Sequence, residues 1–93
     1  MRYIELNSFE KSFKKLPEKE KKQVKKALLQ LVDAFEKQLI PSGMGLKKLT
    51  NSLWELRVGL KLRVIFILKQ DIVELGFVGT HKDILKFIKG SKR

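Results

Sequence analysis

The sequence contains no cysteine and only one histidine. Without thiols it can form neither disulfides nor thiolate metal sites. One imidazole and scattered carboxylates provide no ligand cluster for a metal ion. No apolar stretch reaches the roughly 18 residues that a membrane span requires, and residues 1–20 contain no apolar core of a signal peptide. We therefore expect a soluble cytoplasmic protein with no membrane contact and no cofactor.

Acidic residues are also scarce. The 93 residues include 21 Lys and Arg against 10 Asp and Glu, which gives a formal net charge of +11. Residues 1–40 hold 10 basic and 6 acidic residues (+4), whereas residues 41–93 hold 11 and 4 (+7). Such an excess favours polyanionic partners, with an affinity that falls as salt rises. The alternative is a lysine-rich surface that only keeps the protein soluble. A chain of this length predicts a single domain, residues 1–93.

The first 40 residues predict a strand followed by two helices. We expect the strand at 2–7 and a short helix at 9–16 capped by Ser8. A second helix is expected at 17–39, with Pro17 at its first helical position. Its apolar stripe consists of Val24, Ala27, Leu28, Leu31, Val32, Phe35 and Leu39.

Lysines cover the other faces of this second helix. The run at 19–26 is more typical of a solvated helix face than of an RNA-binding track. Residues 40–45 contain a proline and two glycines, which indicates a loop, and 46–52 lead into a sheet.

Alternating apolar residues predict three strands between 53 and 80. The register that matches apolar residues in the first hairpin pairs Val58 with Leu62, Leu56 with Val64, and Trp54 with Phe66. It places Arg57 opposite Arg63 on the other face, and a slip by one residue would bring arginine into the core. The second hairpin is expected to pair Leu68 with Val73, Phe66 with Leu75, and Val64 with Phe77. We expect both helices to cover the apolar face.

The second face of the predicted sheet carries the charged side chains. Its expected members are Glu55, Arg57, Arg63, Ile65, Ile67, Lys69, Glu74, Gly76 and Val78. Directly opposed like charges destabilise a sheet by roughly 0.2–1 kcal/mol. One explanation is an ion pair between Glu55 and an arginine. The other is a bound phosphate, because two guanidinium groups match phosphate oxygens well.

The end of the chain predicts a short helix after His81, ended by Gly90, with the last three residues frayed. Strand parity places position 81 on the apolar face unless Gly79 interrupts the strand. A histidine hydrogen-bonded in a loop is the alternative to a functional one.

Several segments, in this order and spacing, resemble the RelE/ParE superfamily of toxins from toxin–antitoxin pairs. They are Leu46-Lys47-Lys48-Leu49, Leu53-Trp54-Glu55-Leu56-Arg57, Arg63-Val64-Ile65-Phe66 and Gly79-Thr80-His81. The resemblance covers almost the whole chain. It implies an α+β fold of the RelE-like type, in which an N-terminal strand and a helical hairpin pack on a mainly antiparallel, curved β-sheet, with a short C-terminal helix.

The resemblance also implies a function. Relatives are endoribonucleases that cut mRNA, usually in the ribosomal A site, and are silenced by a co-encoded antitoxin. It implies catalytic roles for Arg63 and His81, with Arg57, Lys47 and Lys48 contacting RNA or stabilising charge. Arg57 and Arg63 are our candidates for stabilising the phosphorane, so the expected catalytic residues are Arg57, Arg63 and His81. We add Lys61, in the first hairpin turn, and Lys82, next to the histidine, as RNA-binding candidates. The expected partners are an acidic antitoxin, mRNA and the ribosome, and the free toxin is expected to be a monomer.

Cleavage of RNA without a metal uses the ribose 2′-OH as nucleophile, with a base, cations around the phosphorane and an acid on the leaving oxygen. One histidine excludes a pair of imidazoles, and residues 42–45 lack the carboxylate that several relatives carry, so the general base stays open. Two other readings also remain: a ParE-like toxin that binds DNA gyrase, and a basic RNA- or ribosome-binding module without catalysis.

Overall fold

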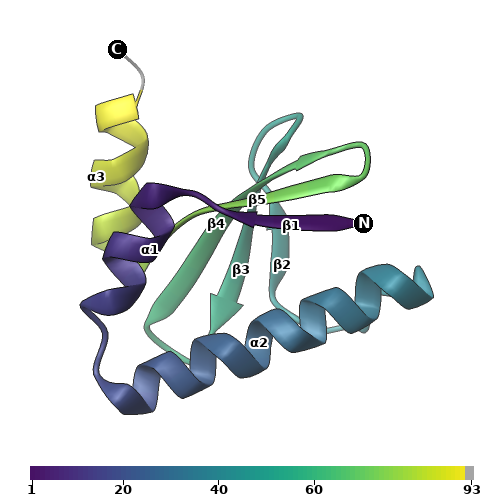
Figure 1. Cartoon of the computed structure of the whole chain (residues 1–93), viewed down its shortest axis with the longest axis horizontal. Coiled ribbons are helices and arrows are strands. Elements are labelled where there is room, and N and C mark those ends of the chain that lie inside the picture. Colours follow the sequence, from purple (N-terminus) through teal and green to yellow (C-terminus); the bar gives the residue numbers. More distant parts are fainter. Residues whose placement is uncertain (92–93) are drawn as a thin grey trace.

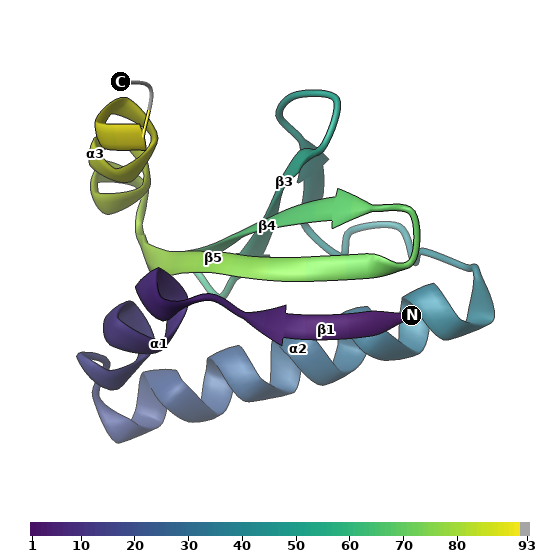
Figure 2. The same ribbon diagram turned by 45° about the horizontal axis from the view of Figure 1, so that its top comes forward.

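The computed structural model describes residues 1–91. In chain order, the elements are β1 (Arg2–Glu5), α1 (Asn7–Lys14), α2 (Glu18–Lys37), β2 (Leu46–Lys48), β3 (Leu53–Val58), β4 (Leu62–Lys69), β5 (Ile72–Thr80) and α3 (His81–Ser91). The helix α2 runs beneath the sheet, and α3 stands on the opposite side at the end of β5 (Figures 1 and 2). The expected α+β architecture is confirmed. No helix within residues 1–91 is long and apolar enough to cross a membrane.

The sheet of the described residues has the order β1-β5-β4-β3-β2. β1 is parallel to β5, and the other neighbours are antiparallel. The short strand β2 was not predicted, because three residues are too few to show an alternation. It begins directly after Gly45, whose backbone has a φ of +85° and whose carbonyl accepts a hydrogen bond from the Arg57 amide.

The register of β3 and β4 is the predicted one, including the pairing of Arg57 with Arg63. The prediction for β5 is correct from Leu68–Val73 to Phe66–Leu75 and wrong beyond it. There Ile65 faces Phe77, and Val64 faces Val78 rather than Phe77, so Gly76 is an extra residue in β5. This β-bulge reverses the parity of the strand end. Val78 therefore lies in the core, and Phe77 takes the face on which we expected Val78.

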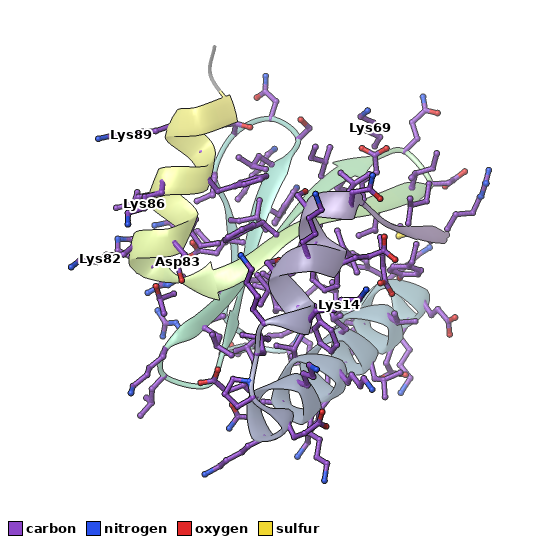
Figure 3. All side chains as sticks on the ribbon, turned by 60° about the vertical axis from the view of Figure 1, so that its left-hand side comes forward. Lys14, Lys69, Lys82, Asp83, Lys86 and Lys89 are labelled. Atoms are coloured by element: carbon purple, nitrogen blue, oxygen red, sulfur yellow. The ribbon has the colours of Figure 1, made fainter. Side chains whose placement is uncertain are left out.

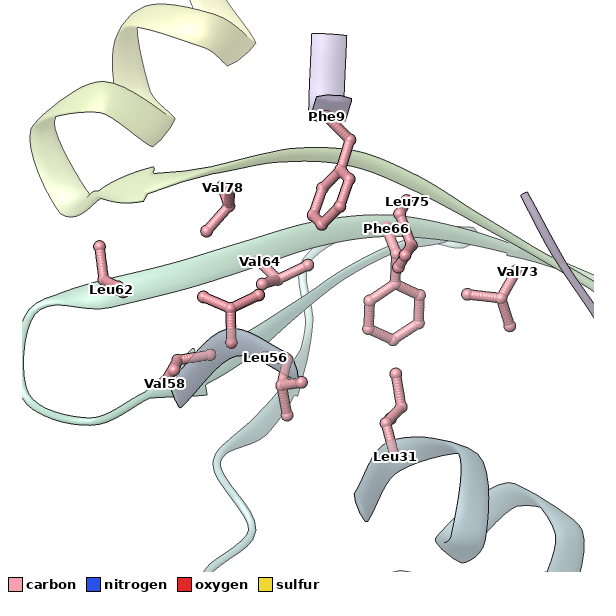
Figure 4. Close-up of a cluster of buried hydrophobic side chains, with 11 residues drawn as sticks. Phe9, Leu31, Leu56, Val58, Leu62, Val64, Phe66, Val73, Leu75 and Val78 are labelled. Carbon is pink, nitrogen blue, oxygen red and sulfur yellow. The ribbon is translucent and has the colours of Figure 1, made fainter. Parts of the chain in front are cut away.

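The hydrophobic core lies between the sheet and the helices α1 and α2 (Figure 4). Phe66 is fully buried at its centre, where its ring contacts Phe35 of α2 and stacks on Trp54 at a centroid distance of 6.4 Å. The predicted stripe of α2 is confirmed for the residues that reach this core: Val24, Ala27, Leu28, Leu31 and Phe35. Leu39 does not, since the helix ends at Lys37 and leaves this side chain exposed.

The ends of the helices differ from the sequence prediction. α1 begins at Asn7 rather than at position 9, and Ser8 does not cap it, because its hydroxyl donates to the carbonyl of Gly76 in the bulge. Pro17 is the N-cap of α2 and not its first helical residue. α3 continues through Gly90 to Ser91, so the glycine does not end it. Residues 92–93, for which we expected fraying, lie outside the described residues.

Candidate functional site

Two arginines lie side by side on the face of the sheet opposite α2. Arg57 of β3 pairs with Arg63 of β4, and Arg63 pairs with Gly79 of β5. Gly45 borders Arg57 on the other side. We call this line of four residues across the sheet the arginine row. Glycine occupies both of its ends, so its only side chains are the two arginines.

Both glycines are required by close packing. A Cβ atom on Gly45 would lie 2.9 Å from the Cβ of Arg57, and one on Gly79 would lie 2.8 Å from the Cβ of Asp83 in α3. Such distances are too short for real carbon atoms, so a larger residue would displace the neighbouring element. The first glycine allows the chain before β2 to approach Arg57. The second allows the first turn of α3 to approach β5 beside Arg63.

Arg63 is held in place by a buried carboxylate. Its guanidinium donates to Glu55 Oε2 at 2.8 Å, and Glu55 is only 6% exposed. The ion pair considered from the sequence therefore exists. Because the carboxylate orients the guanidinium, Arg63 needs little reorganisation to present its remaining N–H groups.

Arg57 differs from Arg63 in its surroundings. Its side chain is exposed, and within residues 1–91 no carboxylate lies within ion-pair distance of it. Lys47 of β2 pairs with Glu55 and so lies on the same face. These three cations against one carboxylate leave this part of the face with a net charge of +2. The arrangement is suited to an anion that bridges an ion-paired guanidinium and an exposed one.

The helix α3 covers the other part of this face. Phe77 of β5 stacks on Phe87 of α3 at a centroid distance of 4.6 Å. Ile65, on the same face as the arginines, is 1% exposed, and Ile84 of α3 is 2% exposed. The charged face is therefore partly covered, over β4 and β5. The bulge contributes to this, because it turns the Phe77 ring toward α3.

A capping box starts α3. The backbone N–H and the hydroxyl of Thr80 both donate to Asp83 Oδ2, at 3.0 and 2.9 Å, and the Asp83 amide donates back to the Thr80 hydroxyl at 3.3 Å. The backbone hydrogen bond from Thr80, followed by that from its hydroxyl, lowers the pKa of Asp83. Sequence reasoning missed this motif, although a threonine followed three residues later by an acidic residue is a recognised signal. Figure 3 shows Asp83 at the base of α3.

His81 is the first residue of α3, and its side chain is exposed. It follows Gly79, the partner of Arg63, by two positions, so the Cα atoms of His81 and Arg63 are at most about 13 Å apart. The expectation that position 81 continues the apolar face is wrong. The bulge at Gly76 places Phe77 and Gly79 on the arginine side, and the strand ends at Thr80.

The predicted RNA-binding lysines are distributed over several places. Lys47 lies on the arginine face, whereas Lys48 points to the opposite face, with its Nζ 5.9 Å from the centroid of Trp54. Lys61, in the β3–β4 turn, lines a pocket of about 520 Å³ together with Thr80 and Asp83. Lys82 lies on the side of α3 that points away from the sheet (Figure 3). Of the four, only Lys47 adjoins the two arginines.

No protein-family model matches the sequence, and no curated protein matches it significantly. Solved structures do match. A chain of the RelB–RelE antitoxin–toxin complex from Methanococcus jannaschii has a TM-score of 0.68 at 19% identity, covering 90% of this chain and 96% of that one. A copper-bound mutant toxin from Helicobacter pylori has a TM-score of 0.62 at 15% identity, with coverages of 90% and 98%. YafQ from E. coli gives 0.62 at 13%, also with coverages of 90% and 98%. The RelE-like fold expected from the sequence is thus confirmed.

Proposed function

We propose that this chain is the toxin of a toxin–antitoxin pair and that it is an endoribonuclease that cleaves mRNA, with the ribosome as its site of action. The single observation that carries the nuclease proposal is the arginine row, in which a fixed and a free guanidinium share one face of the sheet. The toxin proposal is supported by the fold, since structural neighbours include a toxin and an antitoxin–toxin complex.

The two arginines stabilise the phosphorane in this proposal. Charge accumulates on the phosphorus oxygens as the ribose 2′-oxygen attacks, and preoriented donors are most effective where charge develops. Arg63, oriented by Glu55, provides the fixed donor, and Arg57 closes on the phosphate from the solvent side. By analogy with other transition-state donors, each contributes about 2–4 kcal/mol.

His81 acts as the general base. It accepts the proton of the 2′-OH as the new O–P bond forms and the bond from phosphorus to the 5′-oxygen breaks. The products are a 2′,3′-cyclic phosphate and a 5′-hydroxyl. We assign the proton donor for the leaving oxygen to the ammonium group of Lys61, which lies in the β3–β4 turn. Glu55 is buried against Arg63 and is therefore assigned the role of positioning that arginine.

The partners in this proposal are polyanions and an acidic protein. The net charge of +11 favours messenger and ribosomal RNA, with an affinity that decreases steeply as salt rises. The same charge favours an acidic antitoxin that becomes ordered as it covers the basic surface.

The test is to map cut transcripts by sequencing, with and without ribosomes, for the wild type and for Arg57→Ala, Arg63→Ala and His81→Ala. We expect each arginine variant to cleave about 30- to 1000-fold more slowly, the equivalent of 2–4 kcal/mol. The His81 variant should also cleave more slowly, because it lacks the proposed general base. Arg2→Ala is the matched control, because it removes an exposed arginine from the far edge of the sheet and should cleave like the wild type.

Two outcomes would overturn the proposal that the protein is a nuclease. Growth inhibition that persists in all three variants, without cut transcripts, would instead fit a toxin that binds DNA gyrase. Variants that change only the affinity for RNA and its salt dependence, in a protein that never cuts, would fit a passive RNA- or ribosome-binding module. Unfolding curves of each variant separate these outcomes from loss of the fold.

A further inference from the structure

The lysine run of α2 divides into two groups. Lys21 and Lys25 face α1, where each Nζ lies 6.0 Å from the centroid of the Phe13 ring, and Lys21 also pairs with Glu18 at 3.6 Å. Their charges are thus engaged by an aromatic ring and a carboxylate. Lys22 and Lys26 follow one position later on the helix, are exposed, and have no carboxylate within ion-pair distance among residues 1–91.

Lys26 lines a pocket where α2 meets the end of β3. The helix contributes Gln23, Lys26, Ala27 and Gln30, and the strand end contributes Arg57, Val58 and Gly59. The volume is about 290 Å³. The end of β3 lies next to α2 (Figure 1). Arg57 lines this pocket and also belongs to the arginine row on the opposite face of the sheet, so the pocket adjoins the row around the end of β3.

The chemistry of the lining is suited to an anion. Its lining residues include a lysine, an arginine and two glutamines, and no acidic residue among residues 1–91 lines it. Gly59 leaves space at this end of the pocket, since a Cβ there would meet only Gln23 Oε1, at 3.8 Å. Amides and cations together hold phosphate oxygens through hydrogen bonds as well as charge.

We propose that this pocket is a phosphodiester-binding subsite for RNA, occupied by the backbone where it leaves the arginine row and passes the end of β3 onto α2. The subsite rests on the proposed function, since it extends the path of the same substrate. Lys26 and Gln23 contact the phosphate, and Lys22, one turn before Lys26, contributes charge beside it. This assigns an RNA-binding role to one side of a helix whose lysines we expected, from the sequence, to be only solvated.

The test uses 2′-O-methyl oligonucleotides, which have no free 2′-OH and cannot be cleaved by 2′-oxygen attack. A length of about 4 nucleotides fills the arginine row, and a length of about 12 also reaches α2. Lys22→Gln/Lys26→Gln is compared with Lys21→Gln/Lys25→Gln, which removes the same charge from the same helix. We expect the first pair to reduce the slope of log affinity against log salt by about 0.7–1.4 for the long oligonucleotide only. Gln23→Leu should weaken binding of the long oligonucleotide without changing that slope.

Equal effects of the two double variants would show that only overall charge matters, and would overturn the subsite. So would equal effects on both oligonucleotides, unchanged binding by the Lys22/Lys26 pair, or no binding by the wild type. The result also separates this inference from the nuclease. If the pocket variants bind as the wild type while Arg63→Ala stops cleavage, the subsite fails and the nuclease stands. If they lose the long oligonucleotide in a protein that cuts no transcript, the subsite stands and the nuclease fails.

Discussion

The two faces of the sheet are built from alternating residues of the same strands, yet they differ in what they hold. The face under α1 and α2 is closed by apolar side chains, with Val64, Phe66 and Val73 completely buried. The opposite face carries the arginine row, next to a smaller apolar cluster beneath α3. The strand positions on the apolar face fix the register. This leaves the other set free to hold charges that would be unfavourable in a core.

The largest expected effect is a loss of stability when a residue of the apolar face is truncated. Phe66→Ala removes a ring that is 0% exposed and in contact with Trp54 and Phe35, so it should lower the free energy of unfolding by about 3–5 kcal/mol. Arg57→Ala, on the other face, should change stability by no more than about 0.5 kcal/mol. Urea unfolding followed by the fluorescence of Trp54, the only tryptophan, measures both. Similar losses of stability in the two variants would contradict the division between the faces.

The sequence predicted the first hairpin in full because its two periodic runs allow only one register that keeps arginine out of the core. The second hairpin was predicted only up to Leu75. Gly76 has no side chain to reveal a face, so the alternation does not show that one residue is extra. The strand β2 was not predicted because three residues are too few to show an alternation of apolar and polar side chains.

The site was predicted in part. The opposition of Arg57 and Arg63 followed directly from the register. The sequence left two alternatives for these arginines, an ion pair with Glu55 or an open anion site. Strand parity could not decide between them, because the answer depends on side-chain conformation. The placement of α3 could not be derived either, since it depends on the bulge and on the close contact at Gly79, both long-range features.

A smaller effect is expected where α3 approaches the arginine row. Gly79→Ala places a Cβ 2.8 Å from the Cβ of Asp83 and should cost about 1–3 kcal/mol, because the first turn of α3 must move away. Gly90→Ala is the matched control within the same helix. A Cβ there meets nothing within 4 Å, so this change should stabilise the helix by about 0.5–1 kcal/mol. Thermal unfolding of both variants tests the sign, and equal shifts would show that α3 is not packed closely at Gly79.

The capping box holds the start of α3 beside the charged face, so its loss should lower stability on this side of the sheet. Asp83→Ala should lower stability by about 0.5–2 kcal/mol through loss of the cap. Since hydrogen bonds from Thr80 lower the pKa of Asp83 below its ordinary 3.8, the carboxylate stabilises the fold above about pH 4. That contribution disappears as the pH falls through the lowered value. The difference in stability between the wild type and Asp83→Ala should therefore shrink in acid, as denaturant unfolding at pH 6 and about pH 2.5 would measure.

The smallest effect concerns a polar atom on the apolar face. The hydroxyl oxygen of Tyr3 is buried without a hydrogen-bond partner within residues 1–91, so Tyr3→Phe should leave stability unchanged or raise it by up to about 1 kcal/mol. Burial, and then the nearby charge of Glu36, raise the pKa of Tyr3 above 10.0. The folded state thus keeps the phenol proton longer than the unfolded state. Wild-type stability should fall relative to that of Tyr3→Phe as the pH rises past 10. Because Tyr3 is the only tyrosine, the phenolate absorbance reports its ionisation alone, and a midpoint at or below pH 10 would contradict its burial against α2.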